Sequence, residues 1–386
     1  MKTTHTKAKS GLLAAILIVG FCLRPSLTGI GSVLKIIRPE LALSATASGL
    51  LTTLPMLTFA AFSTPASRLN DRIGTGSTLI CGFLSILSGI LLRSFGGLPG
   101  LFLGTVLIGV GICFGNTLMP AIIKEEYPAR YGQVTALNST MLAVSSGLAS
   151  GINYPVAVRI GWRWGQCIWA GAALVGLLAW LPMRGVQVSA KKSAGQRRLL
   201  KNRVAWSVTL FLGISSLLFY SCMSWLATIF VDKGLDPATA GYFVSAFQLT
   251  GIVSSYTVTR LVTGKKDQRP VTFAVIGVFL AGILLILFSS APALLLAGAL
   301  LAGFACNGCF ALSMAFIGFR AANSADTTAL SSMSQTFGYL IAAVGPMGMG
   351  WLYSRFGSWD SNLWLIVAVL MVLLPVSNVC ASDTTI

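Results

Sequence analysis

Arg24 is the residue whose type and place in this sequence most strongly suggest binding chemistry. It lies inside the first long apolar stretch and is followed at once by Pro25. If that stretch crosses a bilayer, a guanidinium at this depth costs about 3 kcal/mol unless it faces a polar cavity or a partner. Pro25 has no backbone N–H, so it frees a carbonyl one turn back and predicts a kink. We expect Arg24 to face a solute; the alternative is that backbone carbonyls hold it in a packing role.

Amide side chains add hydrogen-bonding groups inside other apolar stretches. These amides are Asn116, Gln248, Asn307 and Gln335. A buried amide is costly unless it is paired or lines water, so two or three of the four should contact a solute. Hydrogen bonds between helices are the competing explanation for any one of them. Tyr220 and Tyr339 are candidates for aromatic walls of the same cavity.

Groups needed for catalysis are missing from the apolar stretches. All ten acidic residues lie in loops or at the ends of these stretches, and the one histidine, His5, is in the N-terminal tail. The eight cysteines lie in apolar runs and are expected to be buried thiols. The sequence therefore predicts no enzyme, no metal site and no cofactor, and it argues against proton transfer by a carboxylate within a membrane.

The composition is that of a protein that crosses the membrane many times. The chain has 386 residues, of which 55% are hydrophobic and only 10% are charged. This balance is typical of polytopic membrane proteins and excludes an ordinary soluble domain. The formal net charge of +17 must then be interpreted by its location along the chain, and nucleic-acid binding is not its expected cause.

Twelve apolar stretches are the elements that must position these side chains. Each is about 20 residues long, which is the length of a helix that spans a bilayer. The first is expected to be a retained helix, because no small-residue cleavage site of a signal peptide follows it. The predicted spans are 11–33, 45–66, 77–95, 98–122, 132–158, 164–182, 205–231, 238–262, 270–290, 292–318, 327–353 and 362–380.

The distribution of Lys and Arg predicts the orientation. If the N-terminus is cytoplasmic, 19 of the 27 basic residues lie on the inside, 7 lie on the outside, and Arg24 is the remaining one. Such an excess over short loops predicts that both termini are cytoplasmic. The basic run between the sixth and seventh spans then serves topology and contact with anionic lipid headgroups. It comprises Lys191, Lys192, Arg197, Arg198, Lys201 and Arg203.

The two halves of the chain repeat each other. The tripeptide Thr-Ala-Leu at 135–137 returns at 328–330, and the pair Arg-Leu at 68–69 returns at 260–261. A parallel repeat of two six-helix halves places a binding site between the halves near the middle of the bilayer. The predicted units are an N-terminal half at 1–183, a basic linker at 184–204 and a C-terminal half at 205–386.

Several motifs resemble those of the major facilitator superfamily, over the whole length of the chain. The loop after the second span has that superfamily's Asp-Arg-x-Gly core at Asp71, Arg72 and Gly74, although Ser67 stands where a glycine is usual. More specific motifs are similar to the branch of cyanate and nitroimidazole transporters. They are Leu23-Arg24-Pro25 with Thr28, Asn116 with Met119-Pro120, Tyr220 with Trp225-Leu226, and Gln335 with Gly338-Tyr339.

The resemblance implies a transporter of small polar solutes, often anionic or nitro-bearing. It places Thr28 with Arg24 among the substrate-binding residues. It also implies a gate in which Asp71 pairs with Arg72 or Arg130, and such a pair would act on conformation rather than on proton relay.

The residues and the resemblance together predict an all-α secondary transporter of the inner membrane. It would bind a small anionic or polar planar solute, cyanate-like or nitroaromatic-like, against Arg24 and move it by alternating access. We expect a monomer in the lipid bilayer, with a small-molecule substrate and no nucleic-acid partner. Two alternatives stay open: a multidrug-type exporter of neutral or lipophilic compounds, and a transporter-like sensor that binds solute without moving it.

Overall fold

The structure is a computed structural model, and it describes residues 2–43, 45–187 and 199–386. In this described part the regular structure is helical throughout. Four members of the basic run, at 191–198, lie outside it, while Lys201 and Arg203 lie within it, and the prediction for the run stays a prediction. The helices are α1 (Lys2–Cys22), α2 (Pro25–Glu40), α3 (Ala45–Ile73), α4 (Thr75–Phe95), α5 (Gly97–Glu126), η1 (Pro128–Arg130), α6 (Tyr131–Ile160), α7 (Trp162–Trp180), η2 (Leu181–Met183), α9 (Arg203–Asp232), α10 (Pro237–Val262), α11 (Arg269–Phe288), α12 (Pro292–Arg320), α13 (Ser324–Phe356) and α14 (Trp359–Cys380).

These helices confirm the predicted architecture of twelve membrane spans. Within the described residues, nine segments are long and apolar enough to cross a membrane, and one of them, Gly11–Gly31, joins the end of α1 to the start of α2. The remaining long helices α3, α10 and α13 have 29, 26 and 33 residues, which is enough to span a bilayer at 1.5 Å per residue. Together they make twelve spans.

The first span is broken where the sequence predicts a kink. Helix α1 ends at Cys22 and α2 begins at Pro25, with Arg24 as the residue that precedes the new helix. Pro25 cannot donate to the carbonyl of Phe21, so the helix is interrupted there. The Arg24 carbonyl starts α2 by accepting hydrogen bonds from the backbone N–H and the hydroxyl of Thr28, at 3.0 and 3.1 Å.

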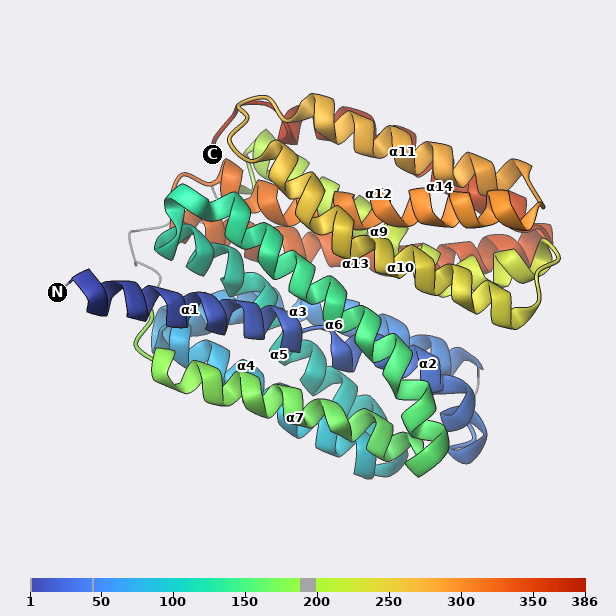
Figure 1. Cartoon of the computed structure of the whole chain (residues 1–386), viewed down its shortest axis with the longest axis horizontal. Coiled ribbons are helices and arrows are strands. Elements are labelled where there is room, and N and C mark those ends of the chain that lie inside the picture. Colours follow the sequence, from blue (N-terminus) through green and yellow to red (C-terminus); the bar gives the residue numbers. More distant parts are fainter. Residues whose placement is uncertain (1, 44, 188–198) are drawn as a thin grey trace.

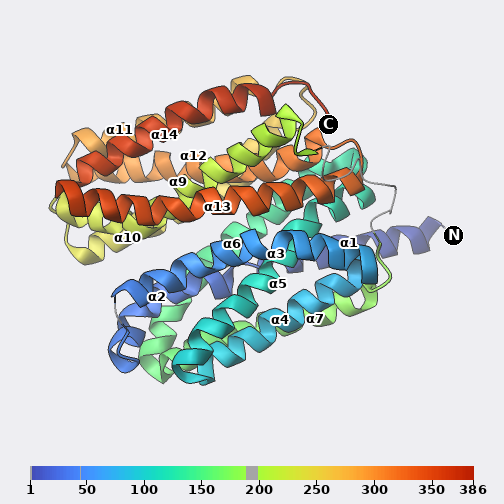
Figure 2. The same ribbon diagram turned by 180° about the vertical axis from the view of Figure 1, so that it is seen from behind.

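The helices form two bundles that lie side by side (Figure 1). Helices α9 to α14 enclose one hydrophobic core, and α1 to α7 supply most of a second core, into which Tyr339 of α13 also packs. Figure 2 shows the same arrangement from behind, with both chain ends on one side of the molecule. We call this side the terminal side and the opposite one the far side. The boundaries of the two halves stay a prediction.

The far side of each bundle carries an ion pair at the equivalent place, with the signs exchanged. In the first bundle Glu40 at the end of α2 pairs with Arg163 at the start of α7. In the second, Lys233 after α9 lies 3.6 Å from Asp360 at the start of α14. The hydrogen bond from Arg163 is the main reason that the pKa of Glu40 is lowered. The repeat seen in the sequence therefore extends to the contacts between helices.

Candidate functional site

Arg24 faces the second bundle across the middle of the molecule. Its side chain is only 7% exposed, and Cζ lies 4.8 Å from the ring centroid of Phe310 on α12 and 5.9 Å from that of Phe219 on α9. Within the described part of the chain, no hydrogen bond or ion pair involves this guanidinium. A cation–π contact contributes roughly 0.5–2 kcal/mol and leaves the N–H donors unused. These donors can therefore serve a ligand.

Three further polar side chains with unused hydrogen-bonding atoms lie on the helices around Arg24. The hydroxyls of Tyr220 and Tyr339 and the Oε1 atom of Gln335 are buried and have no hydrogen-bond partner among the residues that the structure describes. Tyr339 is within electrostatic range of both Arg24 and Tyr220, and Gln335 lies one helical turn from Tyr339 on α13. Buried polar groups are nearly always satisfied, so such a group of exceptions indicates a place where a ligand or water binds.

Beside this group, the side-chain amide nitrogen of Gln335 links the two bundles. It donates to Thr117 Oγ1 on α5 at 3.1 Å and to Ser331 Oγ on its own helix, also at 3.1 Å. The Ser331 hydroxyl in turn donates to the backbone carbonyl of Asn116 at 3.5 Å. Asn116, a predicted site residue, therefore lies at this interface, and its side chain is half-buried. Thr117 extends the predicted set.

The other predicted binding residues are engaged elsewhere. The hydroxyl of Thr28 bonds to the Arg24 carbonyl and serves the start of α2. Gln248 on α10 accepts a hydrogen bond from Ser146 on α6 at 3.4 Å, which joins the bundles at another place. Asn307 donates to the Gly303 carbonyl of its own helix at 2.9 Å and packs against Gly251 of α10. For Gln248 the structure therefore provides the contact between helices that the sequence allowed as an alternative, whereas the hydrogen bond of Asn307 lies within its own helix.

The predicted gate residues lie at the terminal side and are exposed. Asp71 and Arg72 are in the last turn of α3, and Arg130 is in η1. The ion pairs found in the described residues do not include any of the three. The structure thus does not bring Asp71 into a pair with Arg72 or Arg130, and the gate stays a prediction.

Different residues close the terminal side between the two bundles. Lys124 Nζ donates to the Gly318 carbonyl near the end of α12 at 3.0 Å. The Tyr131 hydroxyl donates to the Met314 carbonyl at 3.3 Å, and the Ser324 hydroxyl bonds to Glu125. A hydrogen bond from a lysine to a carbonyl in the last turn of a helix is favourable, because that carbonyl has no partner within the helix and lies at the negative end of the helix dipole. The contact between Lys124 and Gly318 is a helix-capping hydrogen bond and not an ion pair.

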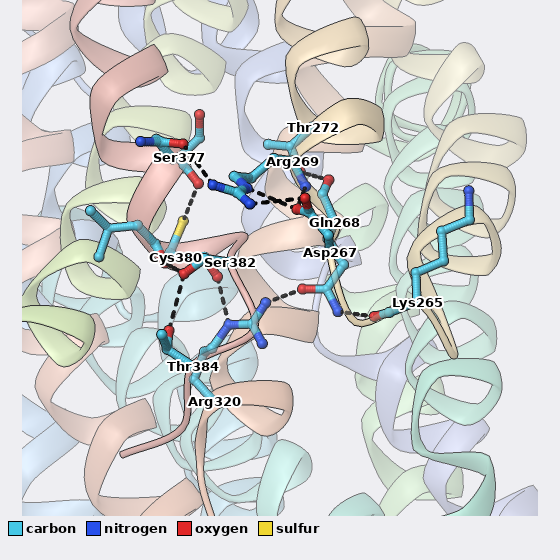
Figure 3. Close-up of polar contacts among 12 residues, drawn as sticks. Lys265, Asp267, Gln268, Arg269, Thr272, Arg320, Ser377, Cys380, Ser382 and Thr384 are labelled. Carbon is cyan, nitrogen blue, oxygen red and sulfur yellow. Dashed lines mark hydrogen bonds and ion pairs between the residues drawn. The ribbon is translucent and has the colours of Figure 1, made fainter.

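Two more arginines are buried: Arg320, which follows the predicted span 292–318, and Arg93, which lies near the end of the predicted span 77–95. Arg320 is 3% exposed at the end of α12; its guanidinium bonds to Gln268 and, at 2.6 Å, to the Cys380 carbonyl, as Figure 3 shows. Arg93 is 1% exposed near the end of α4 and donates to the Ser26 carbonyl at 2.7 Å and to Gln166 Oε1 at 2.6 Å. Unlike Arg24, both have hydrogen-bond partners.

Of the residues that sequence reasoning missed, one could have been identified from the sequence and the others could not. Gln166 lies inside a predicted span, and the argument applied to the other amides would have selected it. Arg93 lies near the end of its span, where a long cationic side chain ordinarily reaches the membrane surface. Phe219 and Phe310 gave no signal, because aromatic residues in apolar helices are usual core residues.

Comparisons with known sequences agree with this fold. The sequence matches the family model of the Major Facilitator Superfamily over residues 16–342 and 232–380. It is 34% identical to the 2-nitroimidazole transporter of Escherichia coli (strain K12), over 96% of this chain and 95% of that protein. It is 25% identical to the cyanate transport protein CynX of the same organism, over 94% of this chain and 96% of that protein.

A further relative is the uncharacterized transporter YycB of Bacillus subtilis (strain 168), which is 38% identical over 94% of this chain and 91% of that protein. Among solved structures, the proton:xylose symporter XylE superimposes with a TM-score of 0.80 at 13% identity, over 98% of both chains. The E. coli fucose transporter FucP, in an outward conformation, gives a TM-score of 0.78 at 14% identity, over 96% of this chain and 98% of that one. At these identities the structural likeness shows the fold.

Proposed function

This chain belongs to the Major Facilitator Superfamily, and on that basis we propose that it carries a small anionic or polar planar solute across the inner membrane by alternating access. It is a multi-pass membrane transporter and not an enzyme. In the proposal Arg24 is the central binding charge, and Tyr220, Tyr339 and Gln335 complete the site. The protein works as a monomer in the lipid bilayer with both termini in the cytoplasm.

The observation that carries the proposal is the unpaired state of Arg24. A guanidinium within the membrane costs several kcal/mol, and here two phenylalanine rings are its charge-stabilising neighbours in the described residues. A planar group with negatively charged oxygens can accept two parallel hydrogen bonds from the fork of the guanidinium. A nitro group and a small anion both provide such acceptors, which agrees with the relatives named for 2-nitroimidazole and for cyanate.

The contacts between the bundles support alternating access. Among the described residues, the hydrogen bonds that join them lie between the terminal side and the level of Gln335 and Gln248, in the middle of their helices. In a chain that rocks its halves about a central site, these are the bonds of a state closed on one side. Opening that side must break the bonds of Lys124, Tyr131 and Gln335.

Uptake into proteoliposomes tests this function. Purified wild-type protein should accumulate radiolabelled 2-nitroimidazole or cyanate faster than empty liposomes, whereas Arg24→Gln should not. The control is Arg355→Gln, which removes an exposed arginine from the end of α13 and should transport like the wild type. Binding of either solute without uptake would identify a sensor. Equal uptake by wild type and Arg24→Gln would overturn the role of Arg24.

A further inference from the structure

The start of α2 is held from outside by two buried side chains of neighbouring helices. Arg93 of α4 donates to the Ser26 carbonyl at 2.7 Å and to Gln166 Oε1 of α7 at 2.6 Å. The Gln166 amide nitrogen donates to the Gly29 carbonyl at 3.3 Å. Arg93 is 1% exposed and Gln166 is fully buried. We call Arg93 and Gln166 the brace, because together they bind the first two turns of α2.

Arg24 depends on these turns for its position. Within the described residues its guanidinium touches two rings and makes no hydrogen bond, so no polar contact fixes the side chain directly. Its own carbonyl is bonded to Thr28 in the first turn of α2. The backbone on its other side is the break after Cys22, where Pro25 has removed a helical hydrogen bond. The direction in which Arg24 points is therefore set by the placement of α2.

The second bundle shows that the fold itself does not require such a brace. Gly104 lies against Gly89 and Arg93, and in the second bundle Gly298 lies against Gly282 and Ile286 in the same way. The position equivalent to Arg93 is therefore Ile286. Counted from the tryptophans that begin α7 and α14, the position equivalent to Gln166 is Leu363. The first span of this bundle, α9, runs unbroken from Arg203 to Asp232. The polar brace thus occurs in the bundle with the broken span and with Arg24.

We propose that Arg93 and Gln166 are positioning residues of the substrate site, which act on the ligand through α2 and Arg24. The inference rests on the proposed function for its effect on binding, but its structural part does not. Burying a second guanidinium is costly, and its hydrogen bonds go to a backbone carbonyl and an amide beside the break. An isoleucine, as at Ile286 in the second bundle, would fill the position without that cost.

Hydrogen exchange of the protein without ligand tests the structural part. In Arg93→Met, amides of residues 23–33 should exchange at least about tenfold faster than in the wild type, and in Gln166→Leu they should exchange faster to a smaller degree. Arg320→Met is the matched control, because it removes a buried arginine of the other bundle and should leave this segment unchanged. Unchanged exchange at 23–33 in folded Arg93→Met or, if that variant does not fold, in Gln166→Leu would overturn the proposal.

Affinity for 2-nitroimidazole or cyanate tests the action through Arg24. Arg93→Met should raise the Kd at least about tenfold, and Arg93→Lys, which keeps one donor site, should raise it less. In an Arg24→Lys background the effect of Arg93→Met should shrink to less than about threefold, because a flexible ammonium depends less on the placement of α2. Equal effects in both backgrounds would show that Arg93 acts independently of Arg24. If Arg24→Gln leaves the affinity unchanged, the proposed function fails, and the exchange data still decide on the brace.

Discussion

At the scale of single residues, the main finding is that three arginines are buried and only one lacks hydrogen-bond partners in the described residues. Arg93 and Arg320 donate to carbonyl and amide oxygens, so their charge is solvated by the protein. In the same part of the chain, the Arg24 guanidinium contacts the aromatic rings of Phe219 and Phe310. The sequence could reveal Arg24 because a charge in the middle of an apolar run is costly. It could not reveal the rings, because a phenylalanine that faces a cation has the same local pattern as one that faces the core.

Replacing Arg24 should separate binding from stability. We expect Arg24→Gln to lose affinity for nitro compounds and small anions while its melting temperature without ligand stays equal or rises, because an unpaired charge is costly to keep in the membrane. Arg24→Lys should bind more weakly than the wild type but still measurably, because an ammonium lacks the planar fork. Thermal shift and ligand titration on the same samples measure both quantities. A destabilised Arg24→Gln with unchanged affinity would mean that Arg24 has a packing role.

Gln335 and Asn116 should report on one ligand pose. They lie on α13 and α5, which are joined through Thr117 and Ser331. Each replaced by Ala should weaken binding by about 1–3 kcal/mol, the usual cost of an unsatisfied polar partner. The double variant should lose less than the sum of the two. Asn307→Ala is the control, since its amide bonds within its own helix. Isothermal titration decides, and additive losses would place the two residues in separate sites.

At the scale of helices, hydropathy located every span but not every helix end. The predicted span 205–231 corresponds to Arg203–Asp232, whereas the predicted span 45–66 corresponds to a helix that continues to Ile73. Hydropathy marks where a helix leaves the lipid, and the helix continues for as long as its backbone bonds are made. The break at Arg24 was predictable, because Pro25 cannot donate. The brace on α2 depends on contacts between α2, α4 and α7, which no local pattern contains.

The cap on α12 should control opening of the terminal side. Lys124→Met removes the donor to the Gly318 carbonyl, and a single hydrogen bond of about 0.5–1.5 kcal/mol corresponds to a roughly two- to tenfold shift in population. A cysteine placed at the buried interface position Ser331 should then react faster with a membrane-impermeant reagent from the terminal side in Lys124→Met than in the protein that keeps Lys124. Lys266→Met, an exposed lysine on the same side, is the control. Equal labelling rates in both variants would show that Lys124 does not hold the gate.

At the scale of the whole molecule, the inventory of buried charges limits how transport can be coupled. In the described residues, the buried charged side chains are Arg24, Arg93, Arg320 and Asp326, and Asp326 lies in the first turn of α13. None is a carboxylate at the depth of Arg24. The solved relatives named as proton symporters share the fold at 13–15% identity, so they do not carry proton coupling over to this chain.

Collapse of the proton gradient should therefore have little effect on transport. At a pH that keeps the protonation of the substrate fixed, uptake of 2-nitroimidazole should change less than about twofold when an uncoupler is added, since no intramembrane carboxylate is available to load and release a proton. Proteoliposomes with an imposed pH gradient measure this directly. Strong proton uptake that does not depend on the substrate would contradict the expectation.

The exchanged ion pairs on the far side also matter while the protein is being assembled. Glu40 meets Arg163 in one bundle, and Lys233 meets Asp360 in the other. Because the two bundles repeat one arrangement of helices, a newly inserted helix can pack against the equivalent helix of the other bundle instead of its own neighbour. Such a mismatch would bring Glu40 toward Asp360, or Lys233 toward Arg163, and like charges repel. Glu40, Arg163 and Asp360 are exposed and Lys233 is partly buried, so each pair contributes little to stability. The larger effect of the pairs is that each helix distinguishes its own bundle from the other one.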